Sequence, residues 1–174
     1  MPNTTALVLI LSDLHEVLRP YLEQNSPAAA AGLKAHLTLL YPFLPMKVIN
    51  EKKVDRLRHF FQHRGPLQFS LVGTSRFPGQ LYLTLAHGAK IRKLVQELRA
   101  EFDGLPADGG NFSDATPHVT IARAAGNAGL NRLEDLFWKQ YGHHFPFVVK
   151  VNVAALIYEQ KGRLQPIQTF PFGV

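Results

Sequence analysis

Cysteine is absent from the 174 residues of this chain. Its absence excludes a disulfide framework, a thiol nucleophile and any zinc or iron–sulfur site with cysteine ligands. Charged residues are also few, at 18%, while apolar residues reach 46%. This composition favours a packed core over a disordered chain, and the length favours a single domain.

Long hydrophobic runs are missing as well. The apolar run near the amino terminus, Ala6–Leu11, covers six residues, whereas a membrane span needs about 20. The same segment has none of the early basic residues that begin a secretory signal. We therefore expect a cytoplasmic protein with no membrane partner, and the lack of cysteine suits a reducing compartment.

Acidic residues are fewer than basic ones, at 13 against 19, which gives a net charge of +6 and a pI near 9.7. Such an excess of positive charge favours an anionic partner, for example RNA or a phosphorylated metabolite. We expect no DNA partner and a monomeric protein.

Hydrophobic periodicity predicts strands and helices in alternation, with no long linker between them. The expected strands cover residues 5–11, 35–41, 67–74, 81–86, 118–123 and 145–151. The expected helices cover 14–23, 51–64, 90–102 and 130–139, followed by a closing hairpin at 153–172. Pro20 means that the first helix either begins near Arg19 or kinks.

The two halves of the chain repeat one order of elements, β-α-β-α-β, over residues 4–75 and 80–152. The same pattern stands at the same point of each half: His36-Leu37-Thr38-Leu39 in the first and His118-Val119-Thr120-Ile121 in the second. The repeat predicts one α+β domain, residues 1–174, built of two duplicated lobes with pseudo-twofold symmetry.

Each HxT pattern places its histidine and threonine on the same face of a strand, because side chains alternate between the faces. If the lobes face each other, two imidazoles and two hydroxyls converge on one cleft. This set suits phosphodiester cleavage. One neutral histidine takes a proton from the attacking oxygen and a protonated one gives a proton to the leaving oxygen. The threonine hydroxyls hold the phosphate oxygens.

The segments AHLTLLYPF and TPHVTIAR resemble the two signature motifs of the 2H phosphoesterase superfamily. Bacterial members of this superfamily include 2′-5′ RNA ligases and RNA 2′,3′-cyclic phosphodiesterases. The resemblance implies a bilobed α+β fold with two antiparallel-dominated sheets around a central cleft. It implies an enzyme that needs no metal or cofactor, with His36 and His118 as the acid–base pair and Thr38 and Thr120 as phosphate ligands.

The resemblance leaves the substrate open. Its first implication is hydrolysis of a 2′,3′-cyclic phosphate at an RNA 3′ end or on a nucleotide, with 2′-5′ RNA ligation as the reverse reaction. One alternative is a cyclic phosphodiesterase of ADP-ribose. The other, favoured by the basic charge, is a module that binds RNA ends with little catalysis.

Further candidates each keep two interpretations. Arg123 would reach a substrate phosphate only at the end of its strand or past a β-bulge, and otherwise forms a surface ion pair. Tyr41 and Phe43 stack on a base or pack into their lobe. The loop 103–116 caps the cleft or is a solvated connection. His59 and His63 have a spacing that permits metal chelation, although a solvated helix face is the simpler interpretation.

Overall fold

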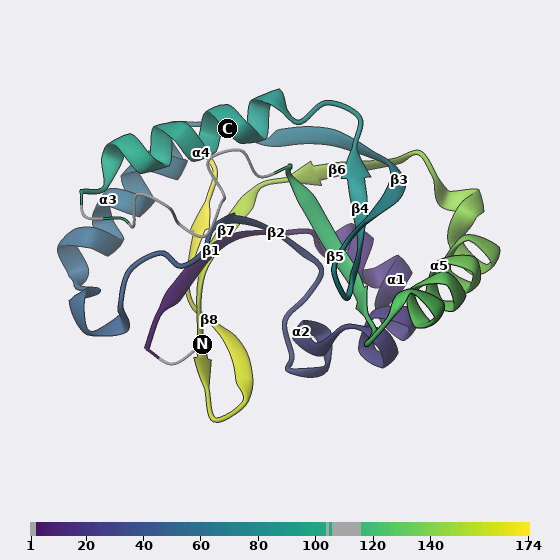
Figure 1. Cartoon of the computed structure of the whole chain (residues 1–174). Coiled ribbons are helices and arrows are strands. Elements are labelled where there is room, and N and C mark those ends of the chain that lie inside the picture. The colour runs from purple at the N-terminus through teal and green to yellow at the C-terminus, as the bar shows by residue number, and fades with distance from the viewer. Residues whose placement is uncertain (1–2, 104, 106–115) are drawn as a thin grey trace.

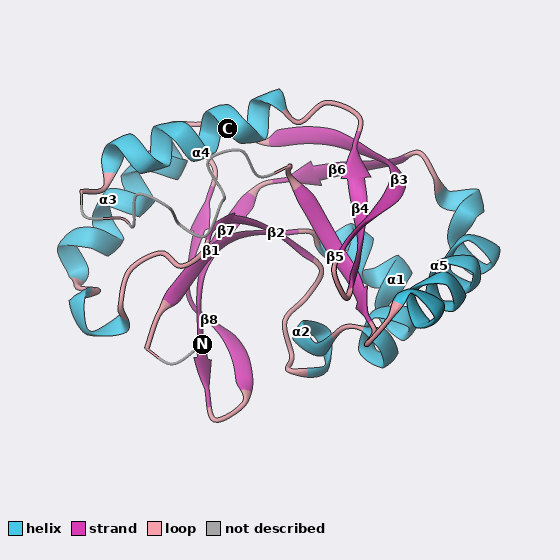
Figure 2. Cartoon of the chain, viewed as in Figure 1, coloured by secondary structure: helices cyan, strands magenta, loops and turns pink. Residues whose placement is uncertain are grey.

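The computed structural model describes residues 3–103, 105 and 116–174, so most of the loop expected at 103–116 lies outside the described residues. The α+β class is confirmed (Figures 1 and 2). The strands are β1 Thr5–Ile10, β2 His36–Leu40, β3 Leu67–Phe77, β4 Gln80–Leu85, β5 His118–Arg123, β6 Phe147–Val151, β7 Val153–Gln160 and β8 Arg163–Pro171. The helices are α1 Ser12–Asn25, α2 Pro27–Ala30, α3 Glu51–Gln62, α4 Ala89–Glu101 and α5 Asn127–Tyr141, with short 3₁₀ turns at Met46–Val48 and Gly142–His144.

The strands form two antiparallel sheets of four, in the orders β2-β1-β7-β8 and β5-β4-β3-β6. The strand that carries each HxT pattern, β2 or β5, is an edge strand of its sheet, and these two edge strands contact each other. The expected closing hairpin is present, because β7 and β8 pair along their whole length. It belongs to the first sheet, where β7 pairs with β1.

The division of the chain into two sequence halves does not match the division into sheets. Strand β3, which the repeat places in the first lobe, pairs with β4 and β6 of the second sheet. The turn at Pro78-Gly79 explains this. It joins β3 directly to β4 as a hairpin, so β3 pairs with its neighbour in sequence. The repeat therefore holds for β1-α1-β2 and β4-α4-β5. The prediction that β3 belongs to the first lobe is corrected, because this strand lies in the second sheet.

Helices α1 and α4 each pack on the sheet of the other lobe (Figure 1). Helix α1 follows a strand of the first sheet but contacts β5 and β6 of the second, and α4 follows a strand of the second sheet but contacts β2 of the first. Helix α3 contacts β8, and α5 contacts β4 and β5. One pair of helices, α3 and α4, thus covers the first sheet, and the other pair, α1 and α5, covers the second.

One hydrophobic core runs through both lobes and joins β1, β2, β4, β5 and their helices. Strand β1, with the sequence TALVLI, is buried over five of its six residues because it lies in the interior of its sheet. Helix α1 continues through Pro20, so it does not begin there. In the described part of the chain, no helix is long and apolar enough to cross a membrane.

Candidate active site

Strands β2 and β5 present their HxT side chains as the alternation argument requires. His36 and Thr38 are half-buried, whereas Leu37 between them is fully buried. In β5, His118 and Thr120 are half-buried and Val119 is fully buried. The buried residues anchor both strands to the core, which leaves the polar pair of each strand on the face toward the other lobe.

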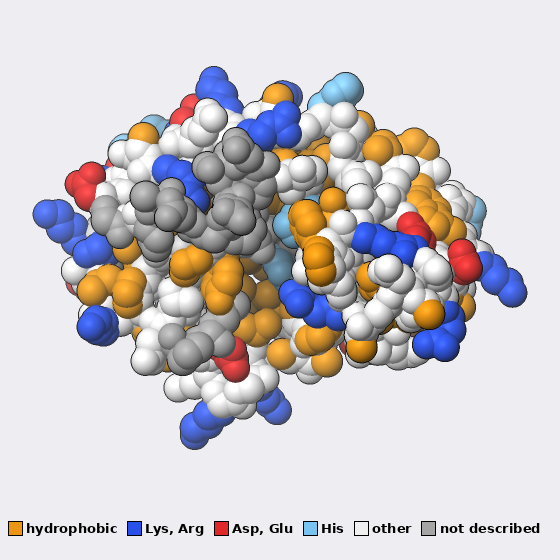
Figure 3. Space-filling model, viewed as in Figure 1, with side chains coloured by type: hydrophobic (Ala, Val, Ile, Leu, Met, Phe, Trp, Pro, Cys, Tyr) orange, Lys and Arg blue, Asp and Glu red, His pale blue; other side chains and the backbone are white. Residues whose placement is uncertain are grey.

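All four HxT side chains line one cavity of about 660 Å³, here called the central cavity. Tyr41 and Arg123 line it too. Figure 3 shows histidine side chains at the bottom of a hollow between the two lobes, with hydrophobic side chains along its rim. The structure therefore brings together six of the seven residues that the sequence predicted as catalytic or substrate-binding.

The two histidines are held in the same way. The Nδ1 of His36 lies 2.9 Å from the carbonyl oxygen of Lys34, and the Nδ1 of His118 lies 2.9 Å from that of Thr116. Because a carbonyl only accepts hydrogen bonds, Nδ1 carries the proton in each neutral ring. The lone pair on each Nε2 then remains available to accept a proton.

Burial lowers the pKa of both His36 and His118 below the ordinary value of 6.5, because the charged imidazolium loses hydration. The hydrogen bond to a backbone carbonyl opposes this shift in each case. In His36 the positive charge of His118 lowers the pKa further, so the two imidazoles repel each other when both are protonated. This repulsion disfavours the state in which both rings are protonated.

The threonine of the second motif has a partner that sequence reasoning missed. Gln80, at the start of β4, donates from its side-chain Nε2 to the Oγ1 of Thr120. The bond occupies an acceptor position of the hydroxyl, so the Thr120 hydrogen is free to donate into the central cavity. Gln80 also lines this cavity.

A β-bulge brings Arg123 to the central cavity. Opposite β5, Tyr82 pairs with Thr120 and Leu81 pairs with Ala122, which leaves Ile121 as an extra residue. Past this bulge the alternation is reset, and Arg123 lies on the same side as the histidine. Of the two arrangements that would let Arg123 reach a substrate, the end of the strand or a β-bulge, the structure shows the bulge.

Strand β2 has the same irregularity. Val8 pairs with Thr38 and Leu7 pairs with Leu40, so Leu39 is the extra residue. Tyr41 follows it and lines the central cavity, as Arg123 does in the other lobe. The two lobes thus offer a phenol and a guanidinium at equivalent positions, and this difference breaks the twofold symmetry of the site.

Comparison with known proteins agrees with this geometry. The family model described as the 2′-5′ RNA ligase superfamily matches residues 11–163. The chain belongs to this superfamily. The expected membership among the 2H phosphoesterases is confirmed, and the superfamily supports an enzyme of the phosphoesterase and ligase class. No curated protein sequence matches the chain.

Several crystal structures share the superfamily fold. LigT from E. coli in its apo form matches with 17% identity over 100% of this chain and 99% of LigT, at a TM-score of 0.61. LigT complexed with 3′-AMP matches with 15% identity over 100% of both chains, at 0.60. TT0787 of Thermus thermophilus matches with 18% identity over 97% of both chains, at 0.66. At these identities the similarity establishes the fold.

The structure contradicts the base-stacking interpretation of Phe43 and supports the alternative, packing into its lobe. Phe43 is 1% exposed, and its ring meets the ring of Phe102 edge-on, with 5.2 Å between their centroids. It packs into the core beyond Pro42, so it does not stack on a base. Two further aromatic residues lie beside His118: the rings of Phe77 and Tyr82 are 5.1 and 5.0 Å from its ring.

The apolar wall of the central cavity was also missed. Leu33, Ile157 and Leu164 line the cavity on the side of the first lobe, next to Tyr41. They come from the segment before β2 and from the β7-β8 hairpin, which are far apart in the sequence. No motif links these segments, and only the pairing of β1 with β7 brings them together.

His59 and His63, at the C-terminal end of α3, do not line the central cavity. The rings of His59 and His63 are 4.0 Å apart, and the Nδ1 of His63 is hydrogen-bonded to the carbonyl of His59. Among the described residues, no group of three or more histidine, aspartate or glutamate side chains is placed to hold a metal ion.

Proposed function

We propose that this protein hydrolyses 2′,3′-cyclic phosphates at RNA 3′ ends or on nucleotides, with His36 and His118 as the acid–base pair. The observation that carries the proposal is the convergence of both HxT pairs on one cavity, with each histidine held through Nδ1. The superfamily and the nucleotide-bound structures of LigT support the choice of substrate class.

In the proposed reaction, a water molecule attacks phosphorus while the neutral imidazole accepts its proton at Nε2. The bond from phosphorus to one ribose oxygen breaks, and the protonated imidazole donates its proton to that oxygen. The product is a phosphomonoester with a free ribose hydroxyl. The reaction requires one neutral and one protonated ring, and the repulsion between the rings disfavours only their double protonation.

Thr38 and Thr120 donate hydrogen bonds to the non-bridging phosphate oxygens and hold phosphorus between the two imidazoles. Arg123 offsets the negative charge on the phosphate from the second lobe. Tyr41, with the apolar wall of the first lobe beside it, contacts the nucleoside. The asymmetry of the two lobes thereby sets the orientation of the substrate.

The test is turnover of an oligoribonucleotide that ends in a 2′,3′-cyclic phosphate, measured in excess EDTA. We expect hydrolysis by the wild type and a loss of about 10²–10⁴-fold in each of His36→Ala and His118→Ala, the usual scale of general acid–base catalysis. His63→Ala, at an exposed position directly after the end of α3, is the matched control and retains full activity.

Retention of most activity by either variant would contradict the proposed mechanism. Tight, salt-sensitive binding of the RNA end by a folded wild-type protein without turnover would instead support an RNA-end-binding module.

A further inference from the structure

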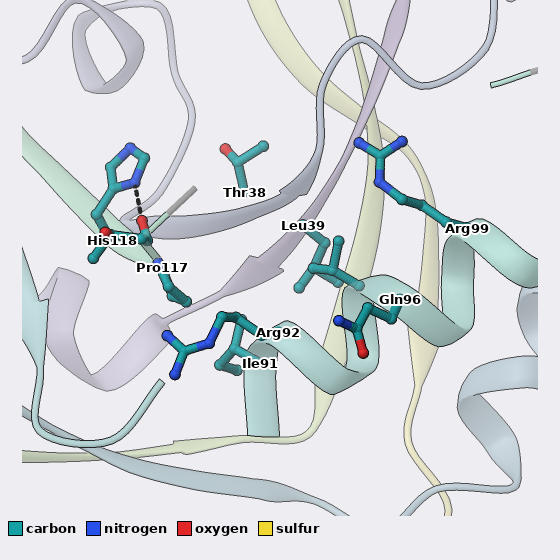
Figure 4. A pocket seen from close by; sticks show the side chains of 10 residues that line it. Thr38, Leu39, Ile91, Arg92, Gln96, Arg99, Pro117 and His118 are labelled. Carbon is teal, nitrogen blue, oxygen red and sulfur yellow. Dashed lines mark hydrogen bonds between the residues drawn. The ribbon is translucent and has the colours of Figure 1, made fainter. Parts of the chain in front are cut away.

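A second, smaller cavity of about 180 Å³ adjoins the central cavity, and both are lined by Thr38 and His118. We call it the α4 cavity, because Arg92, Gln96 and Arg99 of α4 form one wall. Figure 4 shows α4 on one side of it and the strands that carry Thr38 and His118 on the other. The two cavities therefore meet at Thr38 and His118.

The wall formed by α4 is basic because of the spacing of its two arginines. Residues 92, 96 and 99 are spaced by four and three, so they share one face of the helix. They present two guanidinium groups and a side-chain amide. None of the described residues that line the α4 cavity carries a carboxylate. Such a wall suits an anion with several oxygen acceptors.

Arg92 differs from the neighbouring basic residues in its environment. Lys93 and Arg64 both form ion pairs with Glu97, and Arg56 forms one with Glu101. Within the described part of the chain, Arg92 has no such carboxylate partner. The first turn of α4 contains no acidic residue either, so the charge of Arg92 is not offset locally.

Gly88 leaves room for this position of Arg92. A Cβ atom at residue 88 would lie 2.7 Å from Nη1 of Arg92 and 3.2 Å from Cγ of Pro117. The guanidinium therefore lies close to the start of α4, next to Pro117, which immediately precedes His118. The amino-terminal end of a helix carries a partial positive charge. An anion bound between this end and the Arg92 guanidinium would be stabilised by both positive charges.

We propose that the α4 cavity binds a second phosphate of the substrate, with Arg92 as a principal ligand. This inference rests on the proposed function, which places the reacting cyclic phosphate at Thr38 and His118. The second phosphate is either the internucleotide linkage of an RNA end or the pyrophosphate of an ADP-ribose cyclic phosphate. A nucleoside 2′,3′-cyclic phosphate, which has one phosphate only, leaves the α4 cavity empty.

The kinetic test compares three substrates: adenosine 2′,3′-cyclic phosphate, the dinucleotide ApA with a terminal 2′,3′-cyclic phosphate, and the ADP-ribose cyclic phosphate. We expect a second phosphate to raise kcat/KM about tenfold or more, the scale of one arginine–phosphate contact. A higher value for the dinucleotide assigns the cavity to RNA, and a higher value for the ADP-ribose compound assigns it to a pyrophosphate.

Two variants of α4 show whether the gain depends on this cavity. Arg92→Gln should remove most of the gain, so that the ratio between substrates falls toward one. Lys93→Gln removes the same charge one position away, where the side chain is 77% exposed and paired with Glu97, and should retain the wild-type ratio. Equal kcat/KM values for all three substrates in the wild type would overturn the proposal, as would the wild-type ratio in Arg92→Gln.

Equilibrium binding separates this proposal from the proposed function, because it needs no turnover. We expect the dinucleotide ApA with a 3′-phosphate to bind about tenfold more tightly than 3′-AMP, and Arg92→Gln to abolish the difference. If no substrate is turned over but this difference in affinity is found, the proposed function fails, whereas the proposal of a second phosphate site in the α4 cavity is supported. If both ligands bind equally in the wild type, the α4 cavity does not bind an internucleotide phosphate, and the proposal fails unless the ADP-ribose compound shows the gain in kcat/KM.

Discussion

His36 and His118 each donate Nδ1–H to a carbonyl two residues earlier in the chain, and this shared geometry makes the two lobes equivalent at their centre. Around the centre the residues differ. Gln80 and Ala6 occupy equivalent positions in the two lobes. Each immediately precedes the residue that pairs beyond the β-bulge: Leu81 pairs with Ala122, and Leu7 pairs with Leu40. The second lobe therefore has an amide donor where the first lobe has a methyl group. This donor orients the hydroxyl of Thr120.

Replacing Gln80 with leucine tests this orientation. Without the amide donor the Thr120 hydroxyl rotates freely, and we expect kcat for cyclic phosphate opening to fall about tenfold, the equivalent of one hydrogen bond. The unfolding temperature should stay close to that of the wild type. Gln68→Leu, at an exposed position of β3 in the same sheet, is the control. An unchanged kcat in Gln80→Leu would show that Thr120 needs no such partner.

At the scale of secondary-structure elements, alternation along a strand was enough to predict the inward face of β2 and β5. It also restricted a substrate contact of Arg123 to the end of the strand or a β-bulge, and the pairing with β4 shows a bulge. It could not decide between core and cleft for Phe43, because that depends on the ring of Phe102, which is distant in the sequence. For the same reason Phe77 was missed beside His118.

Helix α1 holds the start of strand β2, which carries His36 and Thr38. The Nδ1 of His15 accepts a hydrogen bond of 3.2 Å from the buried backbone N–H of Ala35, and the Ala35 carbonyl accepts one of 2.9 Å from the Leu11 N–H. Both backbone groups of the residue before His36 are thereby fixed. The pKa of His15 is lowered, mainly by burial, so the ring stays neutral and able to accept.

His15→Ala should leave the Ala35 N–H buried without an acceptor and lower the free energy of unfolding by about 1–3 kcal/mol. Chemical denaturation at several pH values measures this loss. Since the pKa of His15 is lower in the folded state, its stabilisation is present above pH 6.5 and is lost as the pH falls through the folded pKa. The variant should therefore show a weaker loss of stability in acid. Equal acid sensitivity of wild type and variant would contradict this role.

At the scale of the whole molecule, the sequence repeat predicted two lobes around a cleft, and two sheets are found. The repeat could not show which sheet receives β3, because the pattern of a strand does not name its partner. It also could not show that α1 and α4 each pack on the lobe opposite to their own strand. These crossings, with the return of β7 and β8 to the first sheet, tie the two lobes together.

We propose that the two lobes form one cooperative domain. Calorimetry should show a single unfolding transition with equal calorimetric and van't Hoff enthalpies. Removal of residues 153–174 should abolish the transition. It leaves β1 without β7 and removes Phe170 and Phe172, which stack on Phe61 of α3. Removal of Val174 alone, which is fully exposed, is the control. Two separate transitions in the full-length protein would show independent lobes.

The pH dependence of kcat/KM, measured for the wild type, His36→Ala and His118→Ala, tests the two-histidine account most directly. Because burial lowers the pKa of both rings, we predict a bell-shaped wild-type profile with its maximum on the acid side of pH 6.5. Each variant should lose one limb of the bell together with its activity. A flat wild-type profile, or a complete bell in either variant, would contradict the assignment of these histidines as acid and base.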